Sequence, residues 1–190
     1  GTMYEFGDGV RYDMAEALRL YQTAAQAGDP SAQTSLAYLF AHGKGVARNE
    51  KEARRLYELA AADKHARAMF NLALMDLRGE GGRRDAANGI KLLEGAASRG
   101  HTGANLELAY LYDDGRGVAR YPKQAAAYYI EALRAARREG RILEVPARIW
   151  TFATRRELQR LLAARGIYRG GIHGFFNAET RKALIAIAEN

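Results

Sequence analysis

Four histidines and one pair of adjacent carboxylates are the side chains of this sequence best suited to bind a metal or transfer a proton. They are His42, His65, His101, His173, Asp113 and Asp114. A zinc site needs three or four ligands that meet at one point. His65 and His101 are 36 residues apart, in the same slot of an internal repeat, and His42 lies beside a glycine turn. We therefore expect surface histidines in turns and no metal site.

The other patterns do not assemble into a catalytic site either. Asp113 and Asp114 precede Gly115 without a histidine or serine partner, so we expect a solvated turn there. The sequence contains four Gly-x-Gly pairs, but a dinucleotide site needs a preceding strand and a third glycine that opens a helix. The absence of cysteine excludes disulfides and thiolate ligands. The sequence predicts no enzymatic activity, no cofactor and no metal.

Basic residues are concentrated in the last part of the chain. Residues 120–190 contain 14 Lys or Arg and 6 Asp or Glu, whereas residues 1–119 contain 15 and 16. Such a segment either binds an anionic partner or forms a solvated arginine-rich surface, and both interpretations stay open. The candidates for contact with nucleic acid are Arg134, Arg137, Arg138, Arg141, Arg148, Arg155 and Arg156. Aromatic residues are not interleaved with them, which argues against a nucleic acid partner.

The elements that must position these residues follow an internal repeat of 36 residues, the strongest pattern in the sequence. Its markers are the glycine pairs Gly7/Gly9, Gly43/Gly45, Gly79/Gly81 and Gly115/Gly117. The same spacing aligns Leu36, Leu72 and Leu108. No apolar run approaches the ~20 residues that a membrane-spanning helix needs.

Each repeat unit is predicted to form two helices. In the segment 32–41 the apolar residues recur at helical spacing. The glycines then end that helix, because glycine adopts the left-handed conformation of a helix C-terminus at little cost. Asn49 is the predicted N-cap of a second helix over residues 50–63. One such pair cannot bury its own apolar face, so neighbouring pairs must stack into a solenoid over residues 1–140.

The unit resembles the Sel1-like repeat, a relative of the tetratricopeptide repeat. The residues that carry the resemblance read Ala-x-x-x-Leu-Ala-x-Leu/Met-aromatic-x-x-Gly-x-Gly-Val, followed by Ala-x-x-Leu-Tyr-x-x-Ala-Ala. The resemblance implies a right-handed, all-α solenoid whose concave face holds a protein partner. Our candidate residues on that face are Gln33, Thr34, Arg67, Asn71, Asp76 and Glu107. The third repeat departs from the pattern at Asp76, Gly82 and Gly89, so we expect it to be the most loosely packed.

Residues 147–190 form a second predicted region, a small module of three helices. This region resembles a small peptidoglycan-binding domain. The residues that carry the resemblance are Glu157-Leu158-Gln159, then Gly166-x-Tyr168-x-Gly170-x-Ile172-x-Gly174-x-Phe176, and then Thr180-Arg181-x-Ala183-Leu184. His173 and Asn177 depart from that family's usual Asp and Gly. The resemblance implies the glycan-binding candidates Tyr168, Arg169, Ile172, His173, Phe175 and Asn177.

A chain that combines Sel1-like repeats with a peptidoglycan-binding-like module resembles the periplasmic part of alphaproteobacterial polarity and localisation factors. They imply a non-enzymatic scaffold in the periplasm, tethered by a membrane segment upstream of this chain. Gly1 to Glu5 fit the repeat pattern, so we expect the chain to open inside a repeat. Two alternatives stay open, namely an adaptor whose C-terminal module only caps the solenoid, and an accessory region of a larger hydrolase.

Overall fold

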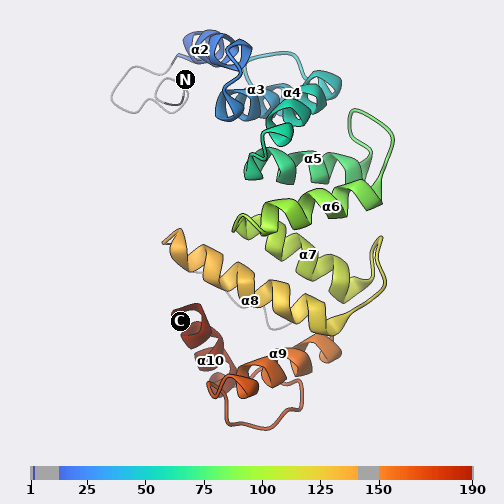
Figure 1. The fold of residues 1–190 in the computed structure, drawn as a ribbon, viewed down its shortest axis with the longest axis vertical. Coiled ribbons are helices and arrows are strands. Elements are labelled where there is room, and N and C mark those ends of the chain that lie inside the picture. The colour runs from blue at the N-terminus through green and yellow to red at the C-terminus, as the bar shows by residue number, and fades with distance from the viewer. Residues whose placement is uncertain (1, 3–12, 141–149, 190) are drawn as a thin grey trace. The chain divides into compact units, whose positions relative to one another are not determined.

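The structure is a computed structural model that describes residue 2, residues 13–140 and residues 150–189. Within these ranges the chain forms helices and no strand, which confirms the predicted all-α class for the described part. In chain order the helices are α2 (Met14–Gln26), α3 (Pro30–His42), α4 (Glu50–Ala62), α5 (Ala66–Arg78), α6 (Ala86–Ala97), α7 (Thr102–Asp114), α8 (Pro122–Arg138), α9 (Phe152–Ala164) and α10 (Ala178–Glu189) (Figure 1). None of these helices is long and apolar enough to cross a membrane.

The chain divides into two compact units, residues 1–96 and residues 97–190. The division does not coincide with the predicted boundary at residues 140–147. Helices α7 and α8, the last predicted repeat pair, belong to the same unit as α9 and α10. The described residues of the predicted three-helix module form two helices, and residues 141–149 lie outside the described ranges.

In the three repeats whose turn the structure describes, the first helix ends at a left-handed glycine, as the sequence predicts; the pair Gly7/Gly9 lies outside the described residues. Gly43, Gly79 and Gly115 follow α3, α5 and α7 with φ angles of 65°, 76° and 75°. In the first of these turns the N–H groups of Gly43 and Lys44 both donate to the carbonyl of Leu39. Helix ends of this kind satisfy carbonyl groups that have no partner inside the helix.

After the turn, one backbone hydrogen bond closes each connection at the same position of the repeat. The N–H of Asn49 donates to the carbonyl of Phe40 at 2.9 Å, and the two later repeats show the same bond. The corresponding pairs are Asp85 to Asp76 at 2.9 Å and Tyr121 to Tyr112 at 2.8 Å. Asn49 also caps α4, since its side chain accepts from the N–H of Glu52 at 3.1 Å, as predicted.

The core of the first unit consists of the residues that recur in the repeat. The helix-facing residues Ala53, Leu56, Tyr57 and Ala60 of α4 are all buried. Alanine at two of these positions lets neighbouring helices approach closely, while the larger side chains fill the space between them. The recurring pattern Ala-x-x-Leu-Tyr-x-x-Ala therefore corresponds to the buried face of α4.

The third repeat makes a close contact at Gly89, one of the positions where it departs from the repeat pattern. A Cβ atom at this position would lie 3.0 Å from the carbonyl oxygen of Ala73 and 3.0 Å from Cγ of Leu77. Glycine therefore lets α6 lie close to α5, where the alanine of other repeats would force Ala73 or Leu77 to shift. The departure from the repeat pattern is an adaptation of packing at this contact.

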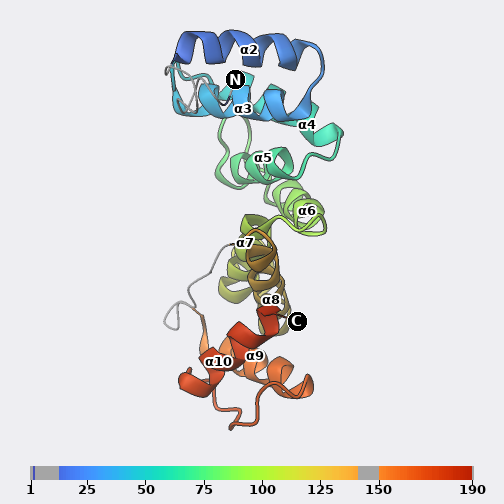
Figure 2. The same cartoon turned by 90° about the vertical axis from the view of Figure 1, so that its left-hand side faces the viewer.

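The second unit buries the end of the repeat array under α9 and α10, which lie against α8 (Figure 1, Figure 2). Its core joins residues of the repeat helices to residues of the C-terminal helices, namely Ala109, Ala126, Tyr129, Ile130, Leu133, Trp150, Leu158, Leu162, Tyr168, Ala183, Leu184 and Ile187. The Trp150 ring stacks on Tyr110 with centroids 4.9 Å apart and contacts Tyr129 at 4.8 Å. The two segments therefore share one hydrophobic core.

Asp113 fastens the C-terminal helices to the last repeat. The N–H of Thr151 donates to its two carboxylate oxygens at 2.9 and 3.2 Å, and the Thr151 hydroxyl donates at 2.5 Å. Thr151 is in turn the N-cap of α9. The predicted solvated turn is wrong for Asp113, which is 1% exposed. The predicted solvated turn is correct for Asp114, an exposed residue that pairs with Arg116.

We predict that Asp113→Ala lowers the free energy of unfolding by about 1–3 kcal/mol, because two donors of Thr151 lose their acceptor in a buried site. Urea denaturation of the whole chain measures the change. The neighbouring substitution Asp114→Ala is the matched control and should cost less than about 1 kcal/mol, since it removes one surface ion pair. Equal effects of the two substitutions would contradict the role given to Asp113.

Candidate functional site

Two of the predicted partner-binding residues are buried and cannot line a groove. Gln33 and Thr34 on α3 are 6% and 2% exposed. The Gln33 amide donates to the carbonyl of Ala25 at 3.3 Å, and the Thr34 hydroxyl donates to that of Pro30 at 2.7 Å. Oγ1 of Thr34 also lies 2.9 Å from Nδ1 of His65. These polar side chains fasten α3 to its neighbours, so their assignment to a partner surface is wrong.

Asp76 is the third buried member of the predicted set. It is 2% exposed, and its carboxylate accepts from the guanidinium of Arg54 at 2.6 Å and from the amide of Asn88 at 2.7 Å. Arg54 donates further to the carbonyl of Glu80 at 3.0 and 3.3 Å. The group joins α4, α5 and α6 inside the first unit. Asp76 therefore holds helices together instead of contacting a partner.

Three members of the predicted set remain accessible. Arg67 is exposed and Asn71 is half-buried, and both lie on α5, four residues apart and hence on one face. Burial raises the pKa of the Tyr57 phenol beneath them, while a hydrogen bond from Asn71 acts in the opposite direction. Glu107, on α7 of the second unit, is half-buried. Arg67 and Asn71 are thus the described candidates on the surface of the first unit.

Gln159 organises the loop between α9 and α10. It is fully buried, and its carbonyl oxygen accepts from the N–H groups of His173 at 3.0 Å and Gly174 at 2.7 Å. Its amide donates to the carbonyl of Phe175 at 2.9 Å. Tyr168 is 2% exposed and donates to the carbonyl of Gly171 at 2.9 Å. The prediction that Tyr168 contacts glycan is therefore wrong, because its side chain belongs to the core.

The other predicted glycan-binding residues lie on the surface of this loop. The exposed ones are Arg169, Ile172, His173, Phe175 and Asn177. Asn177 has a structural task as well, since its Oδ1 accepts from the N–H of Thr180 at 2.8 Å and from the Thr180 hydroxyl at 2.9 Å. Asn177 therefore caps the start of α10.

Exposed aromatic side chains of this loop lie next to an exposed aromatic residue at the start of α9. Phe175 is 63% exposed and Phe152 is 44% exposed, and their rings meet edge to face with centroids 5.4 Å apart. The His173 ring lies 5.5 Å from that of Phe175. The guanidinium of Arg155 lies over the Phe152 ring at 5.4 Å from its centroid. Large exposed apolar groups of this kind mark interaction sites.

Sequence analysis missed Phe152 and considered Arg155 only for nucleic acid. Phe152 is the first residue of α9, 23 residues from Phe175, so no helical or strand periodicity links the two. The available signal was a large aromatic residue directly after the predicted connection. We call the set Phe152, Arg155, Ile172, His173 and Phe175 the aromatic face.

Metal binding finds no support in the described residues. Among them, no group of three or more His, Asp or Glu side chains lies close enough to hold an ion. His65 instead serves the contact with Thr34, and its Nε2 lies 3.5 Å from the hydroxyl of Ser31. Burial lowers the pKa of His65, and the nearby Arg67 acts in the same direction, against a smaller opposite effect of Asp29.

Comparison with known proteins identifies the repeats. The Sel1 repeat model matches residues 1–29, 30–65, 66–101 and 102–136. The fold is similar to the crystal structure of a Sel1 repeat protein from Oxalobacter formigenes, with a TM-score of 0.66 and 23% identity over 99% of this chain and 69% of that one. It is also similar to c5321, a protective antigen of uropathogenic Escherichia coli strains with an SLR fold, with a TM-score of 0.69 and 23% identity over 99% and 36% of the two chains. No curated protein matches the chain.

These matches confirm the predicted all-α solenoid of Sel1-type helix pairs. Because the two structures are only 23% identical to this chain, their similarity shows the fold alone. The matches of the repeat model end at residue 136. The resemblance of residues 147–190 to a peptidoglycan-binding domain therefore stays a prediction.

We predict that Asp76→Ala costs about 3–5 kcal/mol of stability, because it leaves the largely buried guanidinium of Arg54 without its close carboxylate. Glu58→Ala is the matched control, since Glu58 is an exposed partner of the same arginine at 3.9 Å. It should cost less than about 1 kcal/mol. Chemical denaturation of both variants measures the difference, and similar costs would show that the buried pair is not special.

We also predict that His65 makes the first unit less stable in acid. Its folded pKa lies below the ordinary value of 6.5, so the unfolded chain takes up the proton first as the pH falls. The contribution of neutral His65 is complete above that value and is lost progressively below it, down to the folded pKa. The free energy of unfolding at pH 7.5 and 5.5 should differ less in His65→Asn than in the native chain. An unchanged difference would refute this role, and His42→Asn, at the end of α3, is the control.

Proposed function

Because this chain belongs to the Sel1 repeat family, we propose that it is a non-enzymatic scaffold of the bacterial cell envelope. In this proposal the repeats hold a protein partner and the C-terminal helices contact peptidoglycan. Sel1 repeats generally serve as protein-interaction scaffolds without catalytic activity. The observation that carries the scaffold function is the match of four consecutive repeats over residues 1–136.

The polar chemistry of the repeats supports a scaffold. The buried polar groups that sequence analysis considered for function are bound within the fold: Thr34 to the carbonyl of Pro30, Asp76 to Arg54, and Asp113 to Thr151. Arg67 is exposed and Asn71 is half-buried on α5, so both remain accessible to a partner protein. Groups of this kind recognise a partner through hydrogen bonds and charge, and they provide no nucleophile with an adjacent base.

The aromatic face supports contact with the cell wall. Peptidoglycan combines sugar rings with peptide stems that end in carboxylates. Exposed rings such as Phe152 and Phe175 offer apolar surfaces for sugars, and Arg155 offers a cation for a carboxylate. The resemblance of residues 147–190 to a peptidoglycan-binding domain points to the same ligand, and the periplasmic location is proposed on this ground.

The shared core of the second unit supports a structural role for the same helices. Leu158, Leu162 and Leu184 share one buried core with Tyr129 and Ile130 of α8, so removal of α9 and α10 would expose a large apolar surface. Capping and wall contact are compatible, since capping uses the buried faces of these helices and wall contact uses their exposed side chains. A truncated chain is therefore a poor test of wall binding, and point variants of exposed residues are required.

The wall half of the proposal is tested by co-sedimentation of the whole chain with purified sacculi. We predict that Phe152→Ala/Phe175→Ala weakens sedimentation at least about tenfold, because it removes the two exposed rings at the centre of the aromatic face. Leu59→Ala/Ile185→Ala removes two exposed apolar side chains from other helices and should leave sedimentation unchanged. No sedimentation of the native chain, or equal losses in both variants, would refute wall contact.

A further inference from the structure

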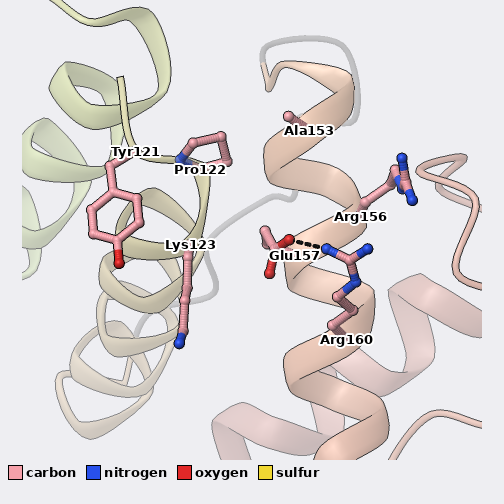
Figure 3. A pocket seen from close by; sticks show the side chains of 7 residues that line it. All are labelled: Tyr121, Pro122, Lys123, Ala153, Arg156, Glu157 and Arg160. Atoms are coloured by element: carbon pink, nitrogen blue, oxygen red, sulfur yellow. Dashed lines mark hydrogen bonds and ion pairs between the residues drawn. The ribbon is translucent and has the colours of Figure 1, made fainter. Parts of the chain in front are cut away.

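A cleft between the first turn of α8 and the outer face of α9 belongs to none of the surfaces described so far (Figure 3). Its volume is about 380 Å³. It is lined by Tyr121, Pro122, Lys123, Ala153, Arg156, Glu157 and Arg160. All of these residues lie in the second unit, at the end of the repeat array. The size falls within the range of clefts that hold small ligands or a few side chains of a partner.

Local structure explains why this cleft is open and partly apolar. Tyr121 precedes α8 as its N-cap, makes no side-chain capping bond, and is 52% exposed. Pro122 occupies the first turn of α8, where its missing N–H costs little. Across the cleft, Ala153 presents only a methyl group from α9. The ring, the proline and the methyl group leave an apolar floor that no described side chain covers.

The rim of the cleft carries an excess of positive charge. Lys123, Arg156 and Arg160 contribute three cations against the single carboxylate of Glu157. Arg160 donates to Glu157, and a dashed line in Figure 3 marks this contact. Lys123 and Arg156 form no ion pair with any residue that the structure describes. Lys123 of α8 and Arg156 of α9 therefore line the cleft without a carboxylate partner among the described residues.

We propose that this cleft binds an acidic segment of a protein partner, with carboxylates at Lys123 and Arg156 and an apolar side chain against Tyr121, Pro122 and Ala153. Lys and Arg form charge-assisted hydrogen bonds with carboxylates. A free inorganic anion would leave the apolar floor unused. Nucleic acid fits less well, because Glu157 lies among the cations and Tyr121 is the single aromatic ring of the lining.

The position of the cleft means that a bound acidic segment contacts two parts of the scaffold at once. It lies where the last repeat meets the C-terminal helices, so its occupant touches both α8 and α9. The inference deepens the protein-binding part of the proposed function by naming the partner's chemistry. It does not depend on contact with peptidoglycan, and the two are measured by different assays.

The test uses the whole chain and two pentapeptide probes. One is acetyl-Gly-Glu-Leu-Glu-Gly-amide, and the other has glutamine in place of both glutamates. We expect the acidic probe to shift the NMR signals of the Lys123 amide and of the Arg156 side-chain N–H, and the glutamine probe to shift neither. Inorganic phosphate at the same concentration is the third probe, and we expect it to bind more weakly than the acidic peptide.

Charge reversal then assigns the binding to the cleft. Lys123→Glu/Arg156→Glu should weaken binding of the acidic peptide at least about tenfold, because two attractions become repulsions. Arg181→Glu/Lys182→Glu makes the same change of charge at exposed residues of α10 and should alter binding less than about twofold. Thermal melts of both variants establish that they fold, so a loss of binding is separated from a loss of structure.

Three results would overturn the proposal. Equal binding of the acidic and glutamine peptides would show that charge does not select the occupant. Phosphate that binds as tightly as the acidic peptide would show that the apolar floor contributes nothing. Shifts confined to residues outside the cleft, or equal losses in the two double variants, would show general attraction to a basic protein. None of these results affects co-sedimentation with sacculi, so the two proposals fail separately.

Discussion

The constraint on which the rest of the structure depends is a left-handed glycine at the end of the first helix of a pair, seen in all three turns that the structure describes. Gly43, Gly79 and Gly115 let the chain leave the helix at once, and the next residues donate back to its last turn. The second glycine of a pair is required for a different reason. At Gly81 a Cβ atom would lie 2.5 Å from the carbonyl oxygen of Glu50, so only glycine permits the turn to approach α4 so closely.

Residues that differ between equivalent positions of the repeats form the specific contacts between helices. Phe40, Asp76 and Tyr112 occupy one column of the repeat, yet only Asp76 is charged, and it is met by Arg54. In the next column the residues are Ala41, Leu77 and Asp113, and the last of these receives Thr151. Repetition thus supplies the helices, and single departures from it specify how neighbours and the C-terminal helices attach.

The C-terminal helices combine a structural role with a proposed binding role. Their inner faces share a core with α8, which covers apolar surface that an unfinished repeat array would expose. Their outer surfaces carry the aromatic face and one wall of the cleft between α8 and α9. Because the buried side chains hold the outer ones in place, a ligand on either surface would be recognised by a preorganised site.

The sequence by itself determined the period, the helix pairs, their glycine ends and the cap at Asn49, because each depends on interactions within a few residues of the chain. Only the tertiary structure decided which polar residues are buried. Thr34, Asp76 and Tyr168 were assigned to surfaces by helical position or family resemblance, yet they contact His65, Arg54 and Gln159, which lie in other segments of the fold. The pair Asp113 and Thr151 joins positions 38 residues apart with no periodic relation. The aromatic face and the cleft between α8 and α9 arise in the same way, since folding brings residues of different segments to one surface.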